Sequence, residues 1–186
     1  MIKKILLGLA AVIVLILIVA AFQPNEFRVK RSATLSASPM ALFEHVNDHH
    51  KFIKWNPWMK LDPTAKTTYA GPEAGVGAVC SWEGNSEVGA GTMTIVESKP
   101  GELVRFRMEF RKPMEGTSTV DFTFKPEGDN TAVTWEMYGP NQYMGKLISL
   151  FIDCDKMCGE QFEKGLANLG EAAAATPAMN TTALPQ

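Results

Sequence analysis

The chain has 186 residues, a formal net charge of −2 and a pI near 5.9. This balance excludes the basic surface that nucleic-acid binding requires, so we expect no nucleic-acid partner. Without an apolar head and a patternless tail, about 145 residues remain, which is enough for one domain with its own core. Cys80, Cys154 and Cys158 are an odd number without repeating spacing, which excludes a disulfide framework.

An uncharged apolar run occupies residues 5–22, after a short tail of residues 1–4. The run exceeds the lower limit of about 17 residues for a helix that crosses a bilayer. It also lacks the polar face that a helix of a soluble domain shows. We interpret it as an uncleaved membrane anchor. A cleaved signal peptide ending at Val19-Ala20-Ala21 is the alternative, but the apolar run is longer than the usual core of such peptides.

The orientation of the anchor is predicted from the basic residues beside it. Lys3 and Lys4 favour a cytoplasmic N-terminus, whereas Arg28, Lys30 and Arg31 follow the other end. We prefer the orientation of an uncleaved export signal. The expected protein is single-pass in a bacterial inner membrane, with its N-terminus in the cytoplasm and its domain outside.

The domain begins with a segment of alternating apolar and polar residues, which is followed by a segment with helical signals. Residues 26–35 alternate as a strand, and Ser38-Pro39 is the N-cap and first position of a short helix. A further helical turn is expected before Pro57. Six strands with turn-rich connections follow and predict an antiparallel meander. Their expected ranges are Lys66–Ala70, Ala78–Glu83, Gly89–Ser98, Leu103–Phe110, Thr117–Pro126 and Thr131–Met137.

Apolar residues at spacings of three and four from Leu147 to Leu169 predict one long amphipathic helix of about 24 residues. Its apolar stripe can be buried only against the apolar face of the sheet. Residues 170–186 lack a pattern, and we expect a disordered tail there. The predicted class is α+β, with a curved antiparallel sheet around a long C-terminal helix. The wedge between sheet and helix is a common type of ligand site.

Several segments also resemble a known superfamily. They are Phe52-x-x-Trp55-Asn56-Pro57-Trp58, Asp62-Pro63, Gly75-Val76-Gly77-Ala78, Gly89-x-Gly91-x-Met93-x-Ile95, Thr131-x-Val133-Thr134-Trp135-x-Met137 and Met157-x-Gly159-x-x-Phe162-Glu163-x-Gly165-Leu166. Over residues 26–169 the chain resembles the START-like superfamily, in particular bacterial polyketide cyclase/dehydrase-like (SRPBCC) proteins. The resemblance implies the helix-grip fold. It does not decide the function, because this superfamily includes binding, transport and catalysis.

Large aromatic residues are the leading candidates for contact with a ligand, because they provide flat apolar walls and indole N–H donors. Taken singly, each of them is more often ordinary core than part of a ligand site. Cys154 is a further candidate because it lies on the apolar stripe of the last helix, although buried cysteines commonly act as small hydrophobic residues. The candidate ligand-binding residues are Trp55, Trp58, Trp82, Phe110, Trp135, Phe151 and Cys154.

Asp48-His49-His50 is the segment most like a metal or acid–base cluster. Adjacent residues of an extended segment point to opposite faces, and a third ligand at motif spacing is missing. We therefore expect no metal and no other cofactor. No nucleophile–base pair or phosphate-binding motif is evident, which favours a non-catalytic role.

The leading hypothesis is a membrane-anchored domain that binds an apolar small molecule or lipid, with the membrane contacted through residues 5–22. One alternative is a cyclase or dehydrase that acts on an apolar substrate. The other is a membrane-tethered domain that docks a protein partner. Two titratable groups converging in the wedge would favour the enzyme, and a large exposed apolar patch would favour the docking domain.

Overall fold

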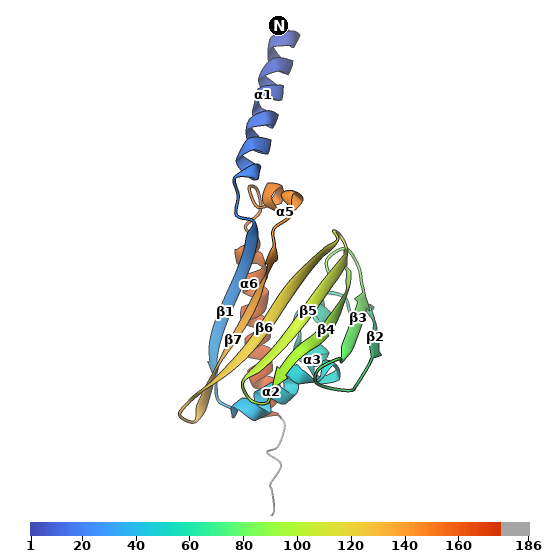
Figure 1. Cartoon of the computed structure of the whole chain (residues 1–186), viewed down its shortest axis with the longest axis vertical. Coiled ribbons are helices and arrows are strands. Elements are labelled where there is room, and N and C mark those ends of the chain that lie inside the picture. The colour runs from blue at the N-terminus through green and yellow to red at the C-terminus, as the bar shows by residue number, and fades with distance from the viewer. Residues whose placement is uncertain (176–186) are drawn as a thin grey trace, which may run out of the picture.

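The structure is a computed structural model that describes residues 1–175. Its first element is α1 (Ile2–Ala21), which includes Lys3 and Lys4 in its first turn rather than in a separate tail. This helix is long and apolar enough to cross a membrane. Its side chains are exposed except near its C-terminal end, where Ala20 is fully buried. The helix projects away from the rest of the protein (Figure 1).

The domain is built on a seven-stranded antiparallel sheet with the order β1-β7-β6-β5-β4-β3-β2. Its strands are β1 (Glu26–Leu35), β2 (Lys66–Ala70), β3 (Val79–Glu83), β4 (Ala90–Lys99), β5 (Leu103–Lys112), β6 (Gly116–Glu127) and β7 (Asn130–Pro140). The predicted meander is confirmed, since each strand from β2 to β7 pairs with the next one in sequence. The first strand, β1, forms one edge of the sheet and pairs with β7, from Glu26 opposite Pro140 to Leu35 opposite Thr131.

Three short helices connect β1 to β2. They are α2 (Pro39–Asn47), α3 (His49–Trp55) and α4 (Trp58–Leu61). The predicted cap of α2 is present, because Ser38 accepts a hydrogen bond from the backbone N–H of Ala41. Asp48 accepts hydrogen bonds from the first backbone N–H groups of α3 and therefore starts a second helix. The break at Asn56-Pro57 separates α3 from α4.

The predicted long helix is wrong in its N-terminal part. The structure has two helices, α5 (Tyr143–Ile148) and α6 (Cys154–Ala174), with a break between them. Asp153 begins α6, since its side chain accepts from the backbone N–H of Lys156 at 2.9 Å. The end was also misplaced, because residues 170–174 continue α6 instead of beginning a tail. Residues 176–186 of the expected disordered tail lie outside the described residues.

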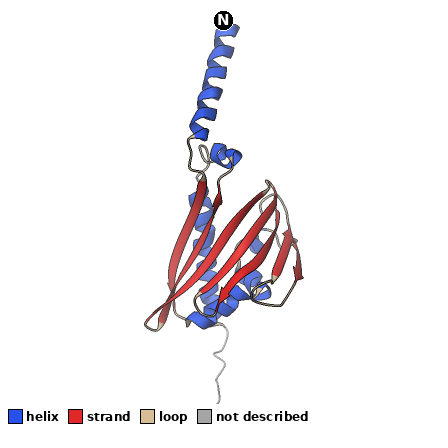
Figure 2. Ribbon diagram, viewed as in Figure 1, coloured by secondary structure: helices blue, strands red, loops and turns tan. Residues whose placement is uncertain are grey.

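The strands curve around α6, which lies along the concave face of the sheet (Figure 2). Arg31 of β1 holds this helix from the inner face. Its Nη2 lies 2.9 Å from Oδ2 of Asp155, and its Nε lies 3.0 Å from Oε1 of Glu163. The guanidinium occupies the space beside Gly159, where any Cβ would collide with it. Arg31 therefore fixes the position of α6, which forms one wall of the cavity described next.

Candidate functional site: an apolar cavity between helix and sheet

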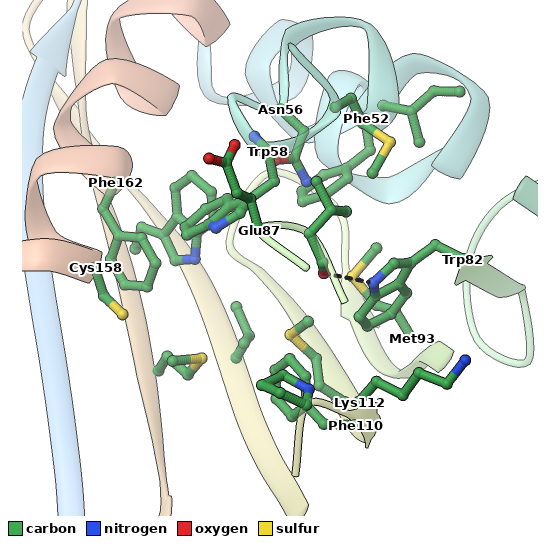
Figure 3. Close-up of a pocket in the computed structure, with 18 residues that line it drawn as sticks. Phe52, Asn56, Trp58, Trp82, Glu87, Met93, Phe110, Lys112, Cys158 and Phe162 are labelled. Carbon is green, nitrogen blue, oxygen red and sulfur yellow. Dashed lines mark hydrogen bonds between the residues drawn. The ribbon is translucent and has the colours of Figure 1, made fainter. Parts of the chain in front are cut away.

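A partly open cavity of about 250 Å³ lies between α6, the short helices and the inner face of the sheet. Its walls are Phe52, Ile53, Asn56, Trp58 and Met59 from α3, α4 and the link between them; Met93, Met108, Phe110, Val120, Trp135 and Met137 from the sheet; Cys158 and Phe162 from α6; and Trp82, Glu87, Val88, Lys112 and Pro113 beside the β3–β4 and β5–β6 connections. Figure 3 shows Trp58, Phe162, Trp82 and Phe110 around the same space. For comparison, an engineered apolar cavity of roughly 150 Å³ binds benzene.

The cavity lies toward the end of the sheet from which α1 projects. Antiparallel pairing places the last residue of β3, the first of β4, the last of β5 and the first of β6 at one end. Glu26 and Pro140, where β1 begins and β7 ends, lie at this same end. The connections that carry Glu87-Val88 and Lys112-Pro113 therefore border the cavity on the side of α1. Figure 1 shows the β5–β6 hairpin and the start of β1 at the same end of the sheet.

Most of the lining is aromatic or contains methionine. Unbranched methionine side chains adapt their shape, so this wall suits apolar ligands of more than one outline. The ionisable groups among the described lining residues are Glu87, Lys112 and Cys158. Lys112 is paired outward, with its Nζ 3.1 Å from Oε1 of Glu83. Burial raises the pKa of the Cys158 thiol, which keeps this group uncharged at neutral pH.

Trp135 forms part of the buried wall of the cavity. Its ring is 3 % exposed and stacks on Phe162, with ring centroids 4.3 Å apart and 6° between the planes. Its Nε1 is buried and has no hydrogen-bond partner among the described residues. The indoles of two other tryptophans are already used within the protein. Trp82 donates to the carbonyl of Val88 at 3.2 Å, and Trp55 donates to the carbonyl of His45 at 3.0 Å. These two N–H groups hold loops and helices in place.

The structure brings four of the seven predicted site residues to the cavity: Trp58, Trp82, Phe110 and Trp135. Trp55 lies behind this wall in the core, where its ring packs edge-on against Trp135 and Phe122. Phe151 was expected to face the wedge, but it lies in the α5–α6 break and is 71 % exposed. Cys154 is the first residue of α6 and does not line the cavity, whereas Cys158, one turn later, does. A ligand-binding role for any of them stays a prediction.

Sequence reasoning missed several lining residues, above all the methionines and Phe162. A signal for two of them was present in the strand alternation. Met108 is two residues before Phe110, and Met137 is two residues after Trp135, so each shares a face with a predicted site residue.

The segment Asp48-His49-His50 has separate structural roles. Asp48 caps α3 through its side chain. His49 is 1 % exposed, and its Nε2 lies 3.2 Å from the carbonyl of Ala78. The ring of His50 packs against Tyr69 with centroids 3.9 Å apart. Within residues 1–175, no group of three His, Cys, Asp or Glu side chains is arranged to hold a metal ion.

Both the sequence and the fold of the domain resemble known proteins. A family model described as "Polyketide cyclase / dehydrase and lipid transport" matches residues 26–174. No curated protein matches the sequence significantly. Solved structures with a similar fold include protein CV1439 from Chromobacterium violaceum, with 18 % identity, 83 % of this chain and 100 % of that chain covered, and a TM-score of 0.57.

Two further structures share the fold at lower identity. Protein MLL2253 from Mesorhizobium loti has 13 % identity and a TM-score of 0.58, with 81 % of this chain and 98 % of that chain covered. The major latex-like protein 151 from Panax ginseng has 11 % identity and a TM-score of 0.53, with 80 % and 97 % covered. At these identities the likeness concerns the helix-grip fold alone.

Proposed function

This chain belongs to the polyketide cyclase/dehydrase and lipid transport family over residues 26–174, and we propose that its domain binds an apolar small molecule or lipid between α6 and the sheet. The observation that carries the proposal is the apolar cavity itself. A partly open apolar cavity of about 250 Å³ in a small domain forfeits packing that would otherwise stabilise the fold. A ligand of matching chemistry restores those contacts. Its apolar body would lie against Trp135, Phe162 and the methionines, and any polar end would point toward the mouth near Glu87.

We also propose that α1 is a single-pass anchor in a bacterial inner membrane, with the N-terminus in the cytoplasm and the domain outside. The length and apolar character of α1 support the anchor, and Lys3 and Lys4 support the orientation. Anchoring would raise the effective concentration of a membrane-derived ligand at the cavity.

The test is to purify the full-length chain from membranes in mild detergent and identify molecules that remain bound. Native mass spectrometry gives the mass of the ligand, and extraction gives its chemistry. The variant Met108→Trp is designed to fill the cavity, because Met108 lines it from β5. The control is Met40→Trp, since Met40 is 46 % exposed on α2 and lies outside the cavity.

We expect a reproducible apolar molecule with the wild type and with Met40→Trp, and at least a tenfold lower occupancy with Met108→Trp. Thermal unfolding of the wild type and both variants verifies that the domain is folded. If the folded wild type retains no molecule and takes up no added oleic acid, the proposed function is wrong. Equal occupancy in folded Met108→Trp would place the ligand elsewhere.

A further inference from the structure

The anchor α1 is not attached to the domain by a free linker. The segment Pro24-Asn25 is held by the residues that follow β7. The backbone N–H of Asn141 donates to the carbonyl of Asn25 at 2.8 Å, and its side chain donates to the carbonyl of Pro24 at 3.1 Å. Lys146 donates from Nζ to the side chain of Asn25. The domain therefore keeps a fixed position relative to the C-terminal end of α1.

The helix α5 lies at the same level as the last turn of α1. The hydroxyl of Tyr143 donates to the carbonyl of Leu17 at 2.9 Å. Leu17 precedes Ala21, the last residue of α1, by four positions, which corresponds to about 6 Å along a helix. Amphipathic segments that lie on membranes bury their apolar side to a depth of roughly 5–10 Å. If α1 crosses a bilayer, α5 is at the depth of the interface. Figure 1 shows α5 beside the end of α1.

The outer side of the region around α5 is apolar and carries no exposed charge. We call residues 143–152, which comprise α5 and the following break, the α5 segment. Tyr143, Met144, Phe151 and Ile152 are all exposed, with Phe151 at 71 %. The cation of the α5 segment, Lys146, is buried and bonded to Asn25. Exposed apolar side chains gathered in this way mark an interaction surface.

We propose that the α5 segment is a second membrane contact, which lies in the interface of the bilayer that α1 crosses. The occupant of the surface is lipid, because the surface is continuous with α1 through the Tyr143–Leu17 hydrogen bond. Tyrosine is also a typical residue of the membrane–water interface. The exposed lining residues Glu87, Lys112 and Pro113 lie at this end of the sheet, so the two contacts hold the open side of the cavity toward the membrane. A lipid could then enter the cavity from the bilayer without crossing bulk water.

This inference rests on the anchor of the proposed function but not on the presence of a ligand. The test uses the full-length chain in phosphatidylcholine vesicles, with the photo-crosslinking amino acid benzoylphenylalanine at one position at a time. Position 151 probes the α5 segment, and position 9, in the middle of α1, reports insertion of the anchor. Position 40 is the matched control, because Met40 is exposed on α2 beside the β4–β5 turn, at the opposite end of the sheet.

We expect lipid adducts at positions 9 and 151, and at least tenfold fewer at position 40. The adducts at position 151 should not decrease in 1 M salt, because the contact involves no exposed charge. Lipid at position 9 without lipid at position 151 would overturn the second contact and leave the anchor intact. Lipid at neither position would overturn the anchor as well. Crosslinks from position 151 to protein would identify a protein-docking surface and also overturn the inference.

Discussion

Trp135 of β7 and Phe162 of α6 stack face to face, with ring planes 6° apart. This pair joins β7 to α6 in the wall of the cavity. Trp135 also packs on Phe122, with ring centroids 4.6 Å apart. The pair thus links the packing of the core to the shape of the proposed binding site.

The first prediction compares two phenylalanines of the C-terminal region. Phe162→Ala should lower the free energy of unfolding by about 3–5 kcal/mol, because the ring is 1 % exposed and its removal enlarges the cavity. Phe151→Ala should change the free energy by less than about 0.5 kcal/mol, because that ring is exposed. Denaturant unfolding in detergent, followed by tryptophan fluorescence, measures both. Equal losses would show that Phe151 packs in the domain as the sequence pattern suggested.

The second prediction concerns the close approach of Gly91 to Trp82. A Cβ at position 91 would collide with the ring of Trp82 and lie 2.7 Å from the carbonyl oxygen of Glu109. Gly91→Ala should therefore displace Trp82 and cost about 1–3 kcal/mol of stability. It should also weaken the binding of an apolar fluorescent probe such as anilinonaphthalene sulfonate, because Trp82 lines the cavity.

The matched control for this variant is Gly116→Ala. A Cβ at position 116, at the start of β6, meets no atom within 4 Å. Stability and probe affinity should both stay near the wild-type values. If the two alanine variants behave alike, the contact between Gly91 and Trp82 does not shape the site.

The third prediction uses two cysteines on one helix. Cys158 lines the cavity, whereas Cys154 lies one turn earlier, outside it. With oleic acid at ten times its dissociation constant, alkylation of Cys158 should slow about tenfold, because only about a tenth of the sites stay free. Alkylation of Cys154 should not change. Peptide mass spectrometry after iodoacetamide treatment gives both rates in one sample.

Cys80 is an unreactive internal control for the same experiment. Burial raises the pKa of its thiol to about 11, so it should remain unmodified at neutral pH. Equal protection of Cys154 and Cys158 would mean that oleic acid acts on α6 as a whole and does not fill the cavity.

The strands could be predicted from the sequence because each has one buried face and one solvent-exposed face. Val104 and Phe106 of β5 are fully buried, and Arg105 and Arg107, which alternate with them, lie on the other face. Such alternation fixes both the strand and its inward side. It therefore placed Phe110 and Trp135 correctly on the inner face of the sheet.

The residues on helices were harder to assign, because spacing does not show on which face a side chain lies beyond a helix break. The break before Pro57 was predicted, whereas the α5–α6 break was not. Trp55 and Trp58 are three residues apart, which would put them on one face of a continuous helix. The break at Asn56-Pro57 places Trp55 in the core and Trp58 on the cavity wall. Likewise, the spacing of apolar residues continues through the α5–α6 break. The signal for that break was Asp153, whose side chain caps the backbone of a new helix.

The last prediction concerns the stability of the domain at mildly acidic pH. Burial lowers the pKa of His49 below its ordinary value, and its Nδ1 has no hydrogen-bond partner among the described residues. Protonation would place a charge and an unpaired N–H in the core. In the unfolded chain the imidazole titrates near pH 6.5, so the unfolded state binds the proton more tightly. The stabilisation is therefore complete above about pH 6.5 and is lost as the pH falls through the folded pKa.

The unfolding midpoint in urea, measured from pH 7.5 to pH 5, should fall with acidification in the wild type. His49→Gln should be less stable at pH 7.5 but should depend less on pH. A weaker dependence should remain in this variant, since burial also lowers the pKa of His45. His50→Gln should keep most of the wild-type dependence, because burial, and not the neighbouring charge of His50, is the main cause of the lowered pKa of His49. If the unfolding midpoint of His49→Gln falls with pH as steeply as that of the wild type, the acid sensitivity belongs to another group.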